Sequence, residues 1–150
     1  MTPPTATTLR QYLDQVIEHT VTCCTQCGKC YEVCPMPRYS AALAGKTAAD
    51  VLPGVLGLLR NETADPASLE WVKLCTQSAR CIPACPEGVD PMKMLRIARM
   101  SAFGSLDGPQ QLKPNDDPQF FRRINAFAAS QLSAEELATW HRGPQADEKE

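Results

Sequence analysis

The residues best suited to chemistry are eight cysteines, a high number for a chain of 150 residues. They lie in two segments, residues 23–34 and 75–85. The first segment reads CCTQCGKCYEVCP and the second reads CTQSARCIPACP, so both end in the pattern C-x-x-x-C-P. The two segments form an imperfect internal repeat, which predicts a pseudo-two-fold relation between two halves of one domain.

The first segment has the spacing C-x-x-C-x-x-C-x-x-x-C-P, which is typical of a bacterial [4Fe–4S] site. Three thiolates on one tight turn lie close enough to bind three corners of such a cluster, and Gly28 lets backbone N–H groups point at the sulfurs. In proteins with two clusters, the cysteine before the proline binds the other cluster. The first cluster is therefore predicted to be held by Cys24, Cys27, Cys30 and Cys85.

The second segment departs from this pattern because Ser78 stands where its second cysteine is expected. By the same rule, the thiolates left for a second cluster are those of Cys34, Cys75 and Cys81. Three thiolates favour a [3Fe–4S] cluster, in which the missing ligand matches the missing iron. The alternative is a [4Fe–4S] cluster whose fourth iron is bound by Ser78, by water or by Cys23. A spare buried thiol is an equally good interpretation of Cys23.

Zinc and disulfide bonds are the other uses that such cysteines have in proteins. A structural zinc site favours paired C-x-x-C knuckles, and the second segment contains no C-x-x-C pair. Disulfides belong to oxidising compartments, and the sequence begins without the basic and apolar regions of an export signal. We therefore expect a cytoplasmic protein that binds iron and sulfide through reduced cysteines.

The segments that must position these cysteines have the apolar spacing of helices, and no stretch alternates for long enough to predict a sheet. The fold class is therefore predicted to be all-α. Residues 1–104 are expected to form the domain that holds both clusters. Residues 105–142 are expected to be a helical extension, and residues 143–150 a disordered tail.

The expected helices begin with one over residues 9–20, capped by Thr8, which leads into the first cysteine segment. Two helical pieces are expected over residues 39–61, with a proline near the start of the second piece. A short helix capped by Ser68 and containing Trp71, a predicted core anchor, leads into the second segment. The clearest helix begins at a cap on Asp90 and stops at Gly104, and a last one covers residues 134–141.

Composition argues against two classes of partner. The net charge is -2 and the isoelectric point is about 5.7, so no basic surface is expected for binding nucleic acid. No stretch supplies the roughly 20 apolar residues that a membrane span needs. Direct contact with a membrane is therefore not expected.

The chain from residue 24 to about residue 102 resembles the small iron–sulfur subunit of heterodisulfide reductases. The resemblance rests on CTQCGKCYEVCP, on Trp71 before Cys75, and on CPEGVDP followed by a helix. The same residues are similar to the C-terminal iron–sulfur domain of the succinate dehydrogenase and fumarate reductase family. At Ser78 the chain follows this second family, whose second cluster is [3Fe–4S]. The [2Fe–2S] domain of that family has no counterpart here, which favours the first resemblance.

The resemblance implies an α-helical ferredoxin with two iron–sulfur clusters between its helices. Such a protein transfers electrons between a flavin-containing subunit and the catalytic subunit of a hetero-oligomeric, heterodisulfide-reductase-like complex. The cysteines have no neighbouring nucleophile, acid–base pair or nucleotide loop, so catalysis is expected in the partners. The alternatives are an iron–sulfur sensor or regulatory protein, the quinone-side iron–sulfur subunit of a succinate-dehydrogenase-like complex, and an enzyme that binds substrate at an iron left open by Ser78.

Overall fold

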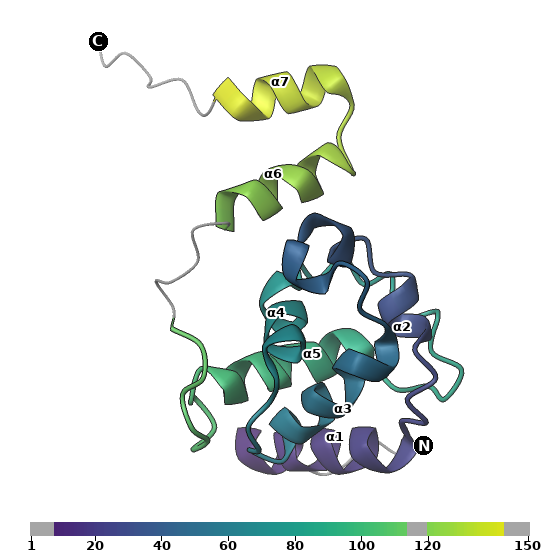
Figure 1. Ribbon diagram of the computed structural model, residues 1–150, viewed down its shortest axis with the longest axis vertical. Helices are drawn as coiled ribbons and strands as arrows, with labels where there is room; N and C mark the ends of the chain where they lie inside the picture. The colour runs from purple at the N-terminus through teal and green to yellow at the C-terminus, as the bar shows by residue number, and fades with distance from the viewer. Residues whose placement is uncertain (1–7, 114–119, 143–150) are drawn as a thin grey trace. The chain divides into compact units, whose positions relative to one another are not determined.

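The computed structural model of the chain describes residues 8–113 and 120–142. Every regular element in these ranges is a helix and none is a strand (Figure 1), which confirms the all-α class. The chain divides into two compact units, Met1–Asp117 and Pro118–Glu150. The predicted disordered tail, residues 143–150, lies outside the described residues.

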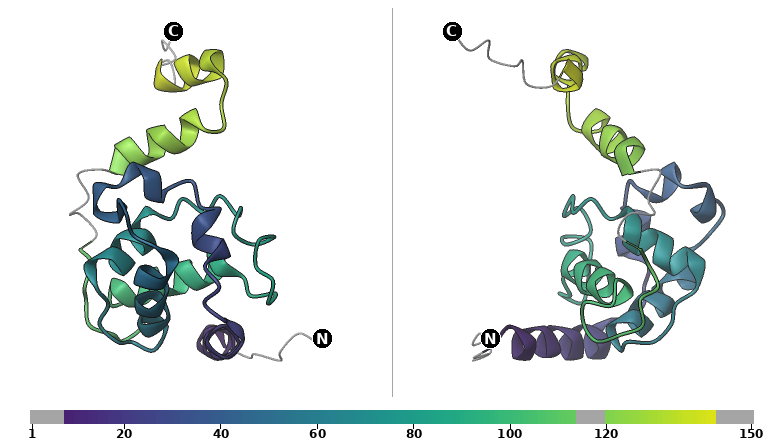
Figure 2. Two further views of the ribbon diagram at one scale, coloured as in Figure 1. Left: turned by 45° about the vertical axis from the view of Figure 1, so that its right-hand side comes forward. Right: turned by 90° about the vertical axis from the view of Figure 1, so that its left-hand side faces the viewer.

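The first helix, α1 (Leu9–Cys23), carries the chain to the first cysteine segment. The Thr8 hydroxyl caps it by accepting a hydrogen bond of 3.2 Å from the backbone N–H of Gln11. The helix packs against α3 (Ala48–Leu59) and α5 (Pro91–Ala102), with Leu13 buried in the core (Figure 2). The helix predicted over residues 9–20 therefore forms, and it continues as far as Cys23.

The core of the first unit lies where α3 and α5 meet α4 (Pro66–Leu74). Its centre is Trp71, which is fully buried and meets the ring of Tyr31 edge-on, with the ring centroids 5.1 Å apart. This confirms Trp71 as a core anchor. Other side chains with no exposed area surround it from the three helices: Val51, Val55, Leu58, Val72 and Ala98.

Gly54 allows α3 to approach the start of α4 closely. A Cβ atom built on Gly54 would lie 2.7 Å from Cβ of Ser68 and 2.8 Å from Oδ2 of Asp65, which is closer than real atoms pack. Ser68 is fully buried at this contact. Its hydroxyl lies 2.8 Å from the carbonyl oxygen of Val51 and also contacts the Asp65 carboxylate. The hydroxyl therefore connects the two helices.

The cap of α4 differs from the predicted one. Asp65, not Ser68, caps the helix, because its Oδ1 accepts hydrogen bonds from the backbone N–H groups of Ala67 (2.9 Å) and Ser68 (3.1 Å). Pro66 follows at the first helical position, where its fixed φ suits a helix and no N–H is needed. The helix thus begins earlier than a Ser68 cap would allow, and Ser68 becomes an interior contact.

The region predicted as two helical pieces contains two short 3-10 turns, η1 (Pro37–Tyr39) and η2 (Ala41–Leu43), followed by α3. A capping box starts α3: Thr47 donates its backbone N–H to Oδ2 of Asp50 at 2.7 Å. Pro53 therefore lies inside the helix and not near its start, which corrects the prediction.

The last helix of the first unit, α5, has the predicted Asp90 cap, which accepts a 2.9 Å hydrogen bond from the backbone N–H of Lys93. It ends at Ala102, two residues before Gly104, whose φ of 76° turns the chain away. None of the described helices is long and apolar enough to cross a membrane.

The second unit contains α6 (Phe120–Ala129) and α7 (Ala134–Arg142). The helix expected over residues 134–141 is confirmed as α7. Ser133 and Glu136 form its capping box, with the Ser133 N–H donating to Glu136 Oε2 at 2.9 Å. The helix α6 lies within residues 105–142, which were predicted as a helical extension, but its bounds were not predicted.

Candidate functional site

The two cysteine segments lie side by side at one edge of the first unit, where α2 (Lys29–Glu32) faces the loop that joins α4 to α5 (Figures 1 and 2). Each segment begins where a helix ends, because Cys24 is the C-cap of α1 and Cys75 is the C-cap of α4. Cys24 and Cys75, the equivalent cysteines of the two segments, therefore each lie at the end of a helix packed on the core.

The repeat extends to the backbone. Each residue from 24 to 35 corresponds to the residue 51 positions later. Gln26 and its counterpart Gln77 have φ of 56° and 59°, and Gly28 and its counterpart Ala79 have φ of 84° and 61°. Ala79 adopts this left-handed conformation although its Cβ disfavours it by about 1 kcal/mol or more. The same turn is thus built twice, the second time without glycine.

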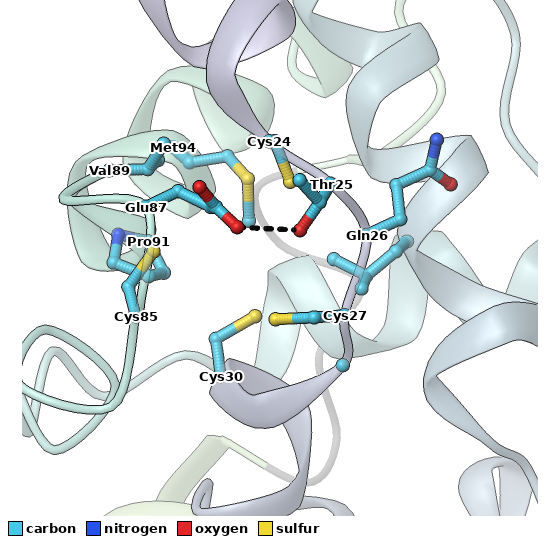
Figure 3. A pocket seen from close by; sticks show the side chains of 12 residues that line it. Cys24, Thr25, Gln26, Cys27, Cys30, Cys85, Glu87, Val89, Pro91 and Met94 are labelled. Atoms are coloured by element: carbon cyan, nitrogen blue, oxygen red, sulfur yellow. Dashed lines mark hydrogen bonds between the residues drawn. The ribbon is translucent and has the colours of Figure 1, made fainter.

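The first turn lies on one side of a small pocket. Figure 3 shows the sulfurs of Cys27 and Cys30 pointing toward each other across it, with Cys24 on a third side. The remaining cysteine comes from the other half of the repeat, because Cys85 also lines this pocket. The four cysteines that sequence reasoning assigned to one cluster therefore line one pocket.

The second turn lies on one side of an adjacent pocket. Cys75 and Cys81 line it together with Cys34, which crosses over from the first half of the repeat. Ser78 lines it at the position that corresponds to Cys27. Cys30 lines both pockets, so the two sites share a wall.

Cys23 is outside both groups of pocket-lining residues. Its sulfur lies 3.5 Å from Nδ1 of His19, one turn earlier on α1. The structure therefore places Cys23 beside a histidine and does not bring it together with the other seven cysteines.

The arrangement of the sulfurs bears on what the pockets could hold. All eight cysteines lie within the described residues and are free thiols. Among the described residues, no three cysteine, histidine or carboxylate side chains converge on a point where they could hold one metal ion. A zinc ion needs its sulfurs about 2.3 Å from a single point. The thiolates of an iron–sulfur cluster bind separate irons, so more widely spread sulfurs suit it better.

Three of the cysteine thiols, those of Cys30, Cys75 and Cys81, have a raised pKa and so hold their protons strongly. Burial, followed by the nearby sulfurs of Cys24 and Cys81, raises the pKa of Cys30 to about 12. Burial and the charge of Cys75 raise the pKa of Cys81 to about 11, and burial also raises the pKa of Cys75. These cysteines are therefore not deprotonated together unless a positively charged group neutralises the negative charge of the thiolates. Binding a metal at these sulfurs would release protons, since the thiolate is the ligand.

Two hydrogen-bond donors in the second pocket lack acceptors. The indole Nε1 of Trp71 and the hydroxyl of Thr76 are buried and have no hydrogen-bond partner within the described part of the chain. Both residues line the second pocket. Buried donors without acceptors are rare and unfavourable, so an acceptor is expected beside them. The sulfide and thiolate sulfurs of a cluster are acceptors, so these residues fit such a group.

Sequence reasoning missed one polar contact at the first pocket. The Thr25 hydroxyl donates a 3.2 Å hydrogen bond to Oε1 of Glu87, which closes one side of the pocket (Figure 3). Thr25 corresponds to Thr76 and Glu87 corresponds to Met36, which lines the second pocket. Aligning the two segments over their full length could have identified these positions as a pair.

The functional interpretation of the site rests on its geometry, because comparison with known proteins adds no information. No protein-family model, curated protein or solved structure matches the chain.

Proposed function

We propose that this protein carries two iron–sulfur clusters and transfers electrons between partner proteins of a larger oxidoreductase. The observation that supports this most directly is the crossed grouping of the cysteines. Each pocket is lined by the early cysteines of one segment and by the last cysteine of the other. That arrangement is typical of proteins with two clusters.

In this proposal Cys24, Cys27, Cys30 and Cys85 hold a [4Fe–4S] cluster in the first pocket. Cys34, Cys75 and Cys81 hold the second cluster, which we propose to be [3Fe–4S] because Ser78 replaces the fourth cysteine. The shared wall at Cys30 supports electron transfer between the sites, because it places them next to each other.

When bound, such clusters each take up and release one electron. The role of the chain is to hold them in place, to exclude water from them with buried side chains such as Trp71, and to donate hydrogen bonds to them. The described residues beside the pockets do not include an acid–base pair, which supports a relay over a catalyst.

We propose as partners a flavoprotein, whose reduced flavin gives up one electron at a time, and a catalytic protein of the heterodisulfide reductase type. A disulfide bound to that catalytic protein takes up two electrons and two protons to give two thiols. Two successive one-electron transfers through this chain would supply those electrons.

The test is anaerobic purification followed by iron and sulfide analysis and by EPR of the oxidised and reduced protein. We expect iron and sulfide in the ratio of one [4Fe–4S] and one [3Fe–4S] cluster, with an EPR signal already present in the oxidised sample. A colourless protein that contains zinc would contradict the proposal. Signals only after reduction would indicate two [4Fe–4S] clusters instead.

A further inference from the structure

The two pockets differ in charge at one equivalent position. Glu87 follows Cys85 and Pro86 at the first pocket, while Met36 follows Cys34 and Pro35 at the second. Among the described residues that line the first pocket, Glu87 alone carries a formal charge. The described residues that line the second pocket include no aspartate, glutamate, lysine, arginine or histidine.

A hydrogen bond holds this charge at the pocket. Oε1 of Glu87 lies 3.2 Å from the Thr25 hydroxyl, and Thr25 sits between the two turn residues Cys24 and Gln26. The corresponding hydroxyl, that of Thr76, is buried without an acceptor in the described part of the chain. The repeat therefore places a fixed carboxylate at one site and an apolar side chain with a free donor at the other.

We propose that Glu87, positioned by Thr25, holds the first site at a lower reduction potential than its counterpart Met36 allows at the second. The inference rests on the proposed clusters. An electron added to the first site is repelled by the carboxylate, whereas the equivalent position at the second site is occupied by the uncharged side chain of Met36. The difference in potential favours electron movement from the first site to the second.

The test is an EPR-monitored redox titration of the whole protein and its variants. Glu87→Gln keeps the size of the side chain and removes its charge. It is expected to raise the midpoint of the first site alone, changing the equilibrium between the sites by about fivefold, or about 40 mV for a one-electron couple. Thr25→Val leaves the Glu87 carboxylate charged but removes the hydrogen bond that holds it at the pocket. The midpoint of the first site is therefore expected to rise by less than in Glu87→Gln.

Two controls separate this effect from others. Glu18→Gln removes an exposed carboxylate on α1, and it is expected to leave both midpoints unchanged. Because Glu87 is exposed, added salt is expected to shrink the difference between wild type and Glu87→Gln. An unchanged first-site midpoint in a Glu87→Gln protein with full iron content would overturn the inference. Absence of iron from the wild-type protein would instead overturn the proposed function.

An independent observation concerns the surface beside Cys34. A surface pocket there is lined by three cations and one carboxylate: Arg38, Lys46, Arg80 and Glu32. Within the described residues, none of the three cations forms an ion pair. The local excess of positive charge contrasts with a net charge of -2 for the chain.

Apolar side chains border the same surface. Val33 lines the pocket and is 42% exposed, and Tyr39 is 36% exposed with the Arg38 guanidinium 5.0 Å above its ring. Exposed aromatic and apolar groups among cations are typical of protein interfaces. Cys34 lies in the wall, so whatever binds here is adjacent to a thiol of the second site.

We infer that this surface docks the acidic face of a redox partner protein, on the proposed role as a relay. Charge complementarity supports this occupant, because an acidic face would neutralise the three cations and bring its own redox group toward Cys34. Three cations are too few for the run of phosphate contacts that nucleic-acid binding uses.

The test measures binding of an acidic flavodoxin to the full chain by calorimetry, without any redox change. Arg38→Glu and Arg80→Glu are each expected to weaken binding about tenfold, and Glu32→Gln to strengthen it. The matched control is Arg60→Glu, an exposed cation outside the pocket, with no expected change. Equal binding by all variants would overturn the inference, as would preference for basic cytochrome c or for anionic lipid vesicles. Iron content, measured separately, tests the proposed function.

Discussion

Ser78 occupies in the second turn the position that Cys27 occupies in the first, and in both turns the two residues beside it have positive φ. A cysteine at position 78 would therefore place its sulfur where the first site already uses one. Because serine is a far weaker ligand for iron than thiolate, this single oxygen-for-sulfur difference would decide how many irons the proposed second cluster contains.

Ser78→Cys is expected to convert the second site from [3Fe–4S] to [4Fe–4S] and to add one iron per chain. The measurements are iron and sulfide content and the EPR signal of the oxidised protein, which should disappear. Cys27→Ser is the matched change at the first site and is expected to remove one iron there. Iron content that is unchanged in both variants would contradict the assigned ligands.

Trp71 is buried in the core and also lines the second pocket, where its indole N–H has no hydrogen-bond acceptor among the described residues. Trp71→Phe removes the indole N–H, which in the proposed complex stabilises the reduced, more negative state of the second site. A hydrogen bond of about 1 kcal/mol corresponds to a decrease of about 40 mV in the one-electron midpoint. Redox titration measures this decrease in midpoint, and Thr76→Val should lower the midpoint of the second site as well. A shift of the first site alone would contradict this assignment.

At the scale of elements, the contact between α3 and α4 depends on the absence of a side chain at Gly54. Gly54→Ala improves helix propensity, yet its Cβ would collide with Ser68 and Asp65. We expect a net loss of about 1–3 kcal/mol in the free energy of unfolding, measured by denaturant titration. Adding Ser68→Ala should recover part of that loss. A more stable Gly54→Ala protein would show that the helices separate easily.

The Asp65 cap of α4 gives a pH-dependent prediction. Burial raises the pKa of Asp65, but hydrogen bonds from Ser68 and Ala67 outweigh it and leave the pKa below the ordinary 3.8. The charged cap therefore contributes stability above pH 3.8 that is lost as the pH falls through the lowered pKa.

Asp65→Asn keeps an acceptor but removes the charge, so it is expected to be less stable than wild type at pH 7. The difference in the free energy of unfolding should narrow below pH 3.8, and Asp65→Ala should lose about 1 kcal/mol at neutral pH. Denaturant titration of the metal-free proteins measures this. A difference that is constant with pH would contradict a role for the charge.

The sequence allowed prediction of those features that local chemistry decides. The Asp90 and Ser133 caps are examples, because each capping side chain accepts a hydrogen bond from a backbone N–H only three residues later. Asp65 and Ser68 are both good caps, and in the structure Ser68 is instead buried against α3 at Gly54. The contact from Thr25 to Glu87 joins residues 62 positions apart, so it depends on how the two halves pack. Helix α6 follows a segment rich in turn-forming residues, so the sequence did not indicate the residue at which the helix begins.

At the scale of the molecule, both pockets and the buried core of the described residues belong to the first unit. The residues packed into that core run from Leu13 to Leu112. The segment after α5 contributes to it, because the Gln111 side chain accepts a 2.9 Å hydrogen bond from the backbone N–H of Ala64 and Leu112 packs on the core. The part that holds the cysteines is therefore larger than residues 1–104, where sequence reasoning placed its boundary.

This difference in boundary predicts the outcome of two truncations. A chain that ends at residue 117 keeps every described core contact, so it is expected to bind the same amount of iron and to unfold at the same denaturant concentration as the full chain. A chain that ends at residue 104 loses the packing of Leu106 and Leu112, so its unfolding midpoint should fall. Iron analysis and denaturant titration of both chains measure this. Loss of iron from the chain that ends at residue 117 would mean that α6 and α7 contribute to the sites.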